Sequence, residues 1–62
     1  MPTITVDGPI IKSLDKKRKL VRKLTESARD VYEIDDIVVL IRENPPENVG
    51  IKGELLIDRM KK

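Results

Sequence analysis

Ile37-Val38-Val39-Leu40-Ile41 is an unbroken apolar run with the length of a β-strand. A run that does not alternate with polar residues indicates a strand covered on both faces. A single helix covers only one face of a sheet, and the chain has room for one long helix. The run therefore predicts a strand whose second face is covered by another subunit.

A second strand is predicted at the amino end of the chain. Thr3-Ile4-Thr5-Val6 is β-branched at every position, which favours extended backbone, and Asp7-Gly8-Pro9 should end it. Two strands separated by a helix form a βαβ unit with parallel strands. We therefore assign the α/β class, as a single βαβ protomer. A two-stranded sheet alone is marginal in water, which again predicts an oligomer.

The helix between the strands is predicted by apolar residues at helical spacing. These residues are Leu20, Val21, Leu24, Ala28 and Val31. Ser13 is a suitable N-cap, so the helix should run from about Leu14 to Val31 or Tyr32. We expect Tyr32 to pack as a cap on the helix end.

The remainder of the chain reads as a loop, a hairpin and a tail. Two prolines predict a loop over Arg42–Asn48, and glycines three residues apart predict a C-terminal hairpin over Val49–Glu54. The apolar segment Leu55–Ile57 could pair with a neighbouring chain, and Asp58–Lys62 is a charged tail. Residues 1–62 make one domain at most.

The composition limits the classes of protein to which the chain can belong. A chain of 62 residues buries only about 60% of the surface it exposes when unfolded. Cys and His are absent, which removes disulfides and ordinary zinc sites. Abundant Lys, Glu and Ile are typical of thermophiles. No apolar run approaches the ~20 residues of a membrane span and no signal peptide is visible, so we expect a cytoplasmic protein.

The amino terminus carries a candidate catalytic group. A small second residue such as Pro2 normally allows Met1 to be removed, which would leave a free proline amine on the tip of a strand. An α-amine has an unperturbed pKa of roughly 7.7–8.0, and burial or a nearby cation lowers it. Pro2 could therefore act as a neutral base near pH 7. The alternative is that Pro2 is only a tolerated second residue.

Three features of the chain are its length, its Met1-Pro2 start and the segment Ile41-Arg42-Glu43-Asn44-Pro45-Pro46-Glu47-Asn48-Val49-Gly50-Ile51-Lys52-Gly53. In this combination the chain resembles the 4-oxalocrotonate tautomerase family. Lys12-Ser13-Leu14-Asp15 and Leu20-Val21 also align, so the resemblance covers nearly the whole chain. It implies a tautomerase-like domain over 1–62 with Pro2 as general base or acid on a conjugated enol or keto acid. It also implies a hexamer with sites built from more than one chain, and neither cofactor nor metal.

Three positions depart from the pattern of well-known members of that family. Lys12 stands where they carry an arginine for the substrate carboxylate, which keeps the charge but loses the bidentate contact. Val38 stands in place of a second arginine, and Val49 in place of an aromatic wall. We expect Pro2 as base, Lys12 on the carboxylate or carbonyl and Val49 as apolar wall. Arg42 could supply a second cation, although a salt bridge to a partner chain is the favoured interpretation.

Other functions stay open. A relative that hydrates or dehalogenates an unsaturated acid would use the proline as an acid, and retention of Met1 would favour a non-catalytic oligomeric scaffold. Lys16-Lys17-Arg18-Lys19 could bind nucleic acid, but four consecutive charges wrap around a helix, so a solvated helix face is favoured. Glu43, Glu47 and Glu54 could be catalytic carboxylates; loop caps and inter-subunit ion pairs are favoured.

Overall fold

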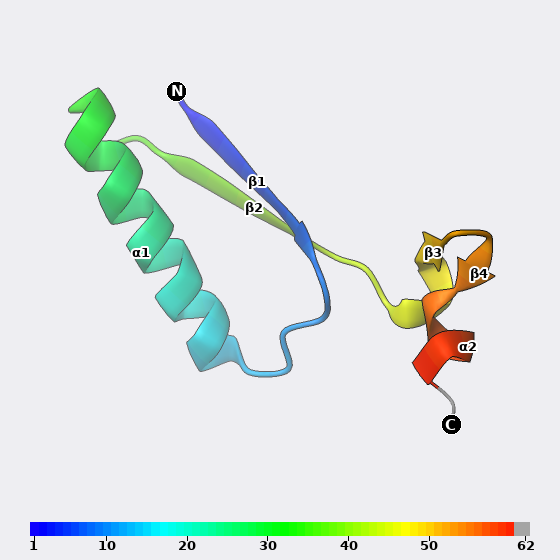
Figure 1. Ribbon diagram of the computed structural model, residues 1–62. Helices are drawn as coiled ribbons and strands as arrows, with labels where there is room; N and C mark the ends of the chain where they lie inside the picture. Colours follow the sequence, from blue (N-terminus) through cyan, green and yellow to red (C-terminus); the bar gives the residue numbers. More distant parts are fainter. Residues whose placement is uncertain (61–62) are drawn as a thin grey trace.

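The structure is a computed structural model that describes residues 1–60. β1 (Thr3–Gly8) and β2 (Val38–Glu43) form a parallel two-stranded sheet, and α1 (Leu14–Tyr32) connects them (Figure 1). The predicted βαβ unit is confirmed. Both strands end two residues later than expected, because Asp7 and Gly8 of β1 pair with the last two residues of β2, and β2 begins at Val38, one residue later than expected. Pro9, which has no N–H group, then ends β1.

Local capping defines the two ends of α1. The Ser13 hydroxyl accepts a hydrogen bond from the Lys16 N–H at 3.3 Å, which confirms the predicted N-cap. At the other end Glu33 has a φ of 58°, and its N–H donates to the carbonyl of Arg29 at 2.8 Å. The expectation that Tyr32 packs as a cap is wrong, because its side chain is 58% exposed and the left-handed Glu33 ends the helix.

The predicted C-terminal hairpin is present. β3 (Gly50–Ile51) and β4 (Glu54–Leu55) pair in antiparallel fashion. Lys52 and Gly53 connect them with φ values of 53° and 85°. Two consecutive positive φ values match the twist of a two-residue hairpin turn, and glycine adopts this region at little cost.

Two expectations around the hairpin need correction. The loop predicted over Arg42–Asn48 is shorter, because its first two residues extend β2 and η1 (Pro46–Asn48) forms a 3₁₀ turn. Of the segment Leu55–Ile57, which was predicted to pair with a neighbouring chain, Leu55 belongs to β4 and the other two residues begin a short helix, α2 (Leu56–Met60). The predicted tail starts inside α2, and its residues 61–62 lie outside the described residues. Within the described part, no helix combines the length and apolar character that a membrane crossing requires.

The two faces of the β1–β2 sheet differ. Glu43 bonds a lysine of α1, so the residues of β2 with the same alternation, Val39 and Ile41, also face α1. The opposite face carries Val38 and Leu40, and the Leu40 side chain is 48% exposed. The single helix thus covers one face of the sheet, as the sequence predicts, and leaves apolar side chains on the other.

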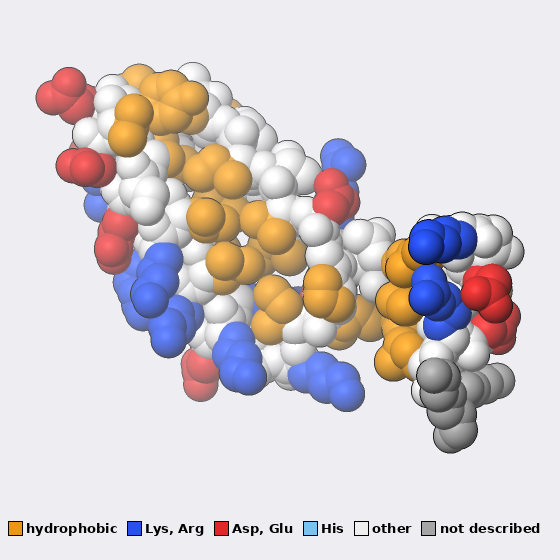
Figure 2. Space-filling model, in the orientation of Figure 1, with side chains coloured by type: hydrophobic (Ala, Val, Ile, Leu, Met, Phe, Trp, Pro, Cys, Tyr) orange, Lys and Arg blue, Asp and Glu red, His pale blue; other side chains and the backbone are white. Residues whose placement is uncertain are grey.

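The protomer is extended. Its dimensions are 47 × 24 × 13 Å, and its radius of gyration is 15.2 Å, against about 11 Å for a compact chain of this length. None of residues 1–60 is classed as buried. Figure 2 shows hydrophobic side chains exposed where α1 meets the strands, with Lys and Arg gathered along the amino-terminal half of α1. The hydrophobic side chains of one protomer do not make a closed core.

Candidate functional site

Pro2 lies at the amino edge of the sheet, directly before β1. Its carbonyl accepts a hydrogen bond from the N–H of Val38 at 2.9 Å, which continues the pairing of the strands by one step. The Pro2 side chain is half-buried, whereas Met1 is 79% exposed. The backbone at Pro2 is therefore fixed by the sheet, and only Met1 extends beyond it.

Lys12 and Arg42 lie at the opposite edge of the sheet. Lys12 is an exposed residue of the connection between β1 and α1, and Arg42 pairs with Asp7 near the carboxyl ends of the strands. Asp7 follows Pro2 by five residues, which is about 17 Å along a strand. The structure therefore does not bring Pro2 together with Lys12 or Arg42 within one chain. Arg42 shares the open face of the sheet with Leu40.

Val49 lines a cavity at this same carboxyl edge. The cavity has a volume of about 330 Å³ and is lined by Gly8, Pro9, Asn44, Val49 and Leu56. The Val49 carbonyl accepts a hydrogen bond from the Leu56 N–H at 2.7 Å, which ties the start of α2 to this residue. Val49 thus lies at the same sheet edge as Lys12 and apart from Pro2 of its own chain.

Glu43, the last residue of β2, has two partners within the chain. One carboxylate oxygen accepts from the Ile11 N–H at 2.7 Å, and the other accepts from the Lys17 Nζ at 2.9 Å. The interpretation of Glu43 as a loop cap is thus confirmed, and its ion pair within the chain is with Lys17. The solvated helix face is wrong at Lys17, whose side chain is only 30% exposed. Neither contact could be found from sequence, because 26 or more residues separate the partners.

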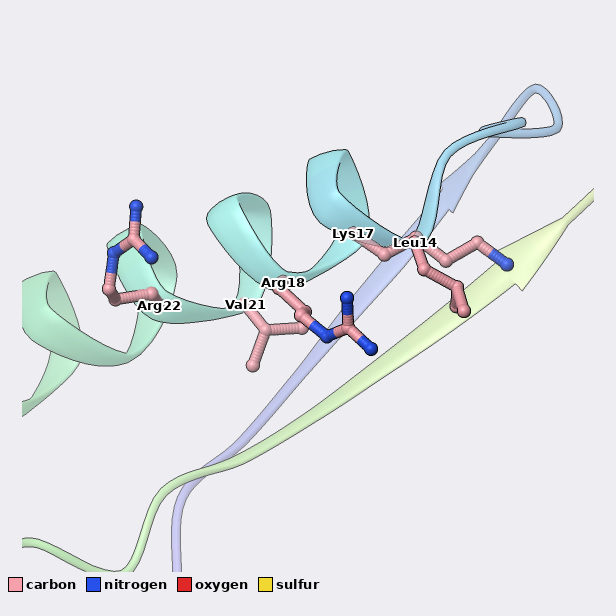
Figure 3. Close-up of a pocket in the computed structure, with 5 residues that line it drawn as sticks. All are labelled: Leu14, Lys17, Arg18, Val21 and Arg22. Carbon is pink, nitrogen blue, oxygen red and sulfur yellow. The ribbon is translucent and has the colours of Figure 1, made fainter.

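A second groove lies along the amino-terminal half of α1, and Lys17, the partner of Glu43, is one of its lining residues. It measures about 340 Å³ and is lined by Leu14, Lys17, Arg18, Val21 and Arg22 (Figure 3). In Figure 3 the Lys17 side chain extends toward the carboxyl ends of the strands, where Glu43 lies. Arg18 pairs with Asp15 at 2.8 Å, but both side chains are largely exposed, so the pair contributes little.

The contacts of Glu43 predict a pH dependence of stability. The Ile11 N–H, and then Lys17, hold the pKa of the Glu43 carboxyl below its usual value. A carboxyl group whose pKa is lower in the folded state stabilises that state. The stabilisation is complete above the pKa of the unfolded chain, roughly 4.3, and is lost as the pH falls through the pKa of the folded state. Glu43→Gln should therefore lower the midpoint temperature of thermal unfolding at pH 7 but hardly change it at pH 3. A difference between the two proteins that stays constant from pH 3 to 7 would contradict this assignment.

Comparison with known proteins decides the family. The model of a protein family described as tautomerase enzyme matches residues 2–59. The chain belongs to the tautomerase family. Among curated proteins it has no significant match.

Solved structures of tautomerase homologues have the same fold. YwhB, described as a homologue of 4-oxalocrotonate tautomerase, is 30% identical, with 92% of this chain and 97% of that chain covered and a TM-score of 0.81. DmpI from Archaeoglobus fulgidus is 42% identical, with 92% and 100% covered and a TM-score of 0.79. A heterohexamer 4-oxalocrotonate tautomerase from Chloroflexus aurantiacus is 20% identical, with 94% and 97% covered and a TM-score of 0.79. These matches confirm the βαβ fold of this tautomerase-family chain.

Proposed function

We propose that this tautomerase-family chain moves a proton on a small unsaturated keto or enol acid without a cofactor, with the Pro2 amine as general base once Met1 is removed. The observation that carries the proposal is that the family match spans residues 2–59 and so begins at Pro2. The bond from Val38 N–H to the Pro2 carbonyl gives the amine a rigid mount.

Lys12 is proposed to bind the substrate carboxylate or polarise its carbonyl, and Val49 to supply an apolar wall. Abstraction of a proton leaves a dienolate, whose negative charge a lysine ammonium stabilises most strongly in a site that excludes water. Because Pro2 and Lys12 lie at opposite sheet edges of one chain, Pro2 would work with Lys12 of the partner subunit. Arg42 is proposed as a further cation for the same substrate.

We also propose a homo-oligomer of six copies, the assembly that the family resemblance implies. The open sheet face with Val38 and Leu40 and the extended shape of the protomer both support association, since exposed apolar side chains are stabilised by burial against another copy. Assembly would bring residues from different sheet edges into one site.

Leu40→Asp should break this assembly. A carboxylate at the centre of a sheet face that becomes buried would lose its hydration, and a single neighbouring Arg42 would offset that cost only in part. Leu40→Met is the matched control, because it keeps an apolar side chain of similar volume. In analytical ultracentrifugation at micromolar concentration, the parent chain and Leu40→Met should sediment as oligomers and Leu40→Asp as a smaller species. A folded monomer of the parent chain would contradict the assembly.

The pH dependence of turnover tests the proposed base. Only a neutral amine accepts a proton, so turnover of a model enol–keto acid should rise with pH and then level off as the Pro2 amine loses its proton. The measurement uses a chain whose intact mass shows that it begins at Pro2. A rate that does not change across this titration, or no turnover at all, would contradict the proposal.

A further inference from the structure

The Glu43 side chain joins three elements of the chain. It extends from the last residue of β2. It accepts one hydrogen bond from the Ile11 N–H, in the connection that precedes α1, and another from the Lys17 Nζ, in the first turns of α1. The distances are 2.7 and 2.9 Å, and the Lys17 and Glu43 side chains are 30% and 26% exposed. Both carboxylate oxygens are therefore engaged in a partly shielded position.

The connection that Glu43 holds carries Lys12. Within residues 1–60, the bond from the Ile11 N–H to Glu43 is the one hydrogen bond that anchors residues 9–12. On either side, Asn44 N–H bonds the Gly8 carbonyl at 2.8 Å and Ser13 caps α1. Lys12 follows Ile11 directly, so the contact that fixes the Ile11 amide also fixes the backbone from which the Lys12 side chain extends.

We propose that Glu43 is a positioning residue, which holds the Ile11 backbone and thereby sets where the Lys12 ammonium meets the substrate carboxylate. This rests on the proposed function of Lys12. Glu43 acts through Lys12 and does not touch the substrate. Lys17 holds the Glu43 carboxylate in place, and its ammonium and the Ile11 N–H favour the ionised form in which both oxygens accept hydrogen bonds.

The two contacts at this position require the carboxylate of a glutamate, and a neutral polar side chain cannot make both. Glutamine offers one oxygen to the Ile11 N–H but turns an NH₂ group toward the Lys17 ammonium, so it keeps one contact and loses the other. Alanine loses both. The expected order of activity is therefore Glu43, then Glu43→Gln, then Glu43→Ala. The adjacent Arg42 cannot take over this contact, because it points away from α1 and its guanidinium accepts no hydrogen bond.

A double-mutant cycle tests the proposal, with turnover measured on a mass-verified chain that begins at Pro2. Glu43→Ala should lower kcat/KM about tenfold, the size of one lost charge-assisted contact, and chiefly through a higher KM. In a chain that already carries Lys12→Ala, adding Glu43→Ala should change kcat/KM by less than about twofold, because the group that Glu43 positions is gone. Equal losses in both backgrounds would overturn the inference.

Two controls separate positioning from a general loss of structure. Lys17→Gln should reproduce part of the Glu43→Ala effect, whereas Arg18→Gln, which removes an exposed charge on the same helix, should leave kcat/KM unchanged. Glu43→Gln provides a milder variant where Glu43→Ala fails to assemble, and it should give an intermediate KM. A Glu43→Gln enzyme with the parent KM would overturn the proposal.

Hydrogen exchange at the Ile11 amide gives a readout that does not depend on turnover. The amide should exchange slowly in the parent chain and faster in Glu43→Ala, and Lys12→Ala should leave it slow. If the Ile11 amide exchanges equally fast in the parent and in Glu43→Ala, the positioning role of Glu43 is overturned while the proposed function of the protein stands. A parent enzyme whose turnover is indifferent to Lys12→Ala overturns the proposed role of Lys12, and the inference with it.

Discussion

A chain that retains Met1 is expected to lose proline-dependent turnover by about 10²–10⁴-fold, the usual contribution of a general base. With Met1 in place the Pro2 nitrogen is part of an amide, and an amide nitrogen does not accept a proton near neutral pH. The sheet contact of Pro2 uses its carbonyl and not its nitrogen, so the fold does not require Met1 to leave. Loss of activity would therefore reflect chemistry and not misfolding.

Two chains of otherwise identical sequence make the comparison, one beginning at Met1 and one at Pro2, both prepared by chemical synthesis and verified by intact mass. Each is assayed with the same enol–keto acid, and sedimentation checks that both assemble alike. Pro2→Ala, processed to a terminal alanine, is the graded control, because it keeps an amine but changes its basicity and freedom, so a partial loss is expected. Equal rates for the Met1 and Pro2 chains would end the proposed mechanism.

Lys12→Ala is expected to lower kcat/KM about ten- to a hundredfold. The variant removes the proposed charge-assisted contact to the substrate carboxylate, which is worth roughly 1.5–3 kcal/mol, so KM should rise. In the proposed site it also removes a cation that favours the neutral Pro2 amine, so the rising limb of the pH–rate profile should move to higher pH. Steady-state kinetics across the pH range measure the two effects separately.

Lys12→Arg is the matched control for this prediction. It keeps the charge and adds a planar guanidinium that contacts both carboxylate oxygens, so its KM should equal or fall below that of the parent. Lys12 is exposed in the protomer, so neither substitution removes packed side-chain volume. A Lys12→Ala enzyme with the KM and pH profile of the parent would show that Lys12 does not bind the substrate.

The strands and the long helix could be predicted from sequence because local patterns specify them. The apolar spacing of Leu20 and Val31 and the cap at Ser13 predicted α1 to within a residue or two. The ends of β1 and β2 were less certain, since Asp7 and Gly8 join the sheet only because partners from β2 lie beside them. Within Leu55–Ile57 only Leu55 lies in a strand and the next two residues begin α2, because a short apolar segment fits a strand or the start of a helix equally well.

By itself, the sequence determined the βαβ unit, the hairpin and the placing of Pro2 directly after Met1, which depend on residue type and on short spacings. Only the tertiary structure decided that Glu43 bonds Ile11 and Lys17, and that Pro2 and Lys12 lie at opposite edges of the sheet. Such contacts depend on which strands pair and in which register. Side chains distant in sequence meet, or stay apart, only when that register is set.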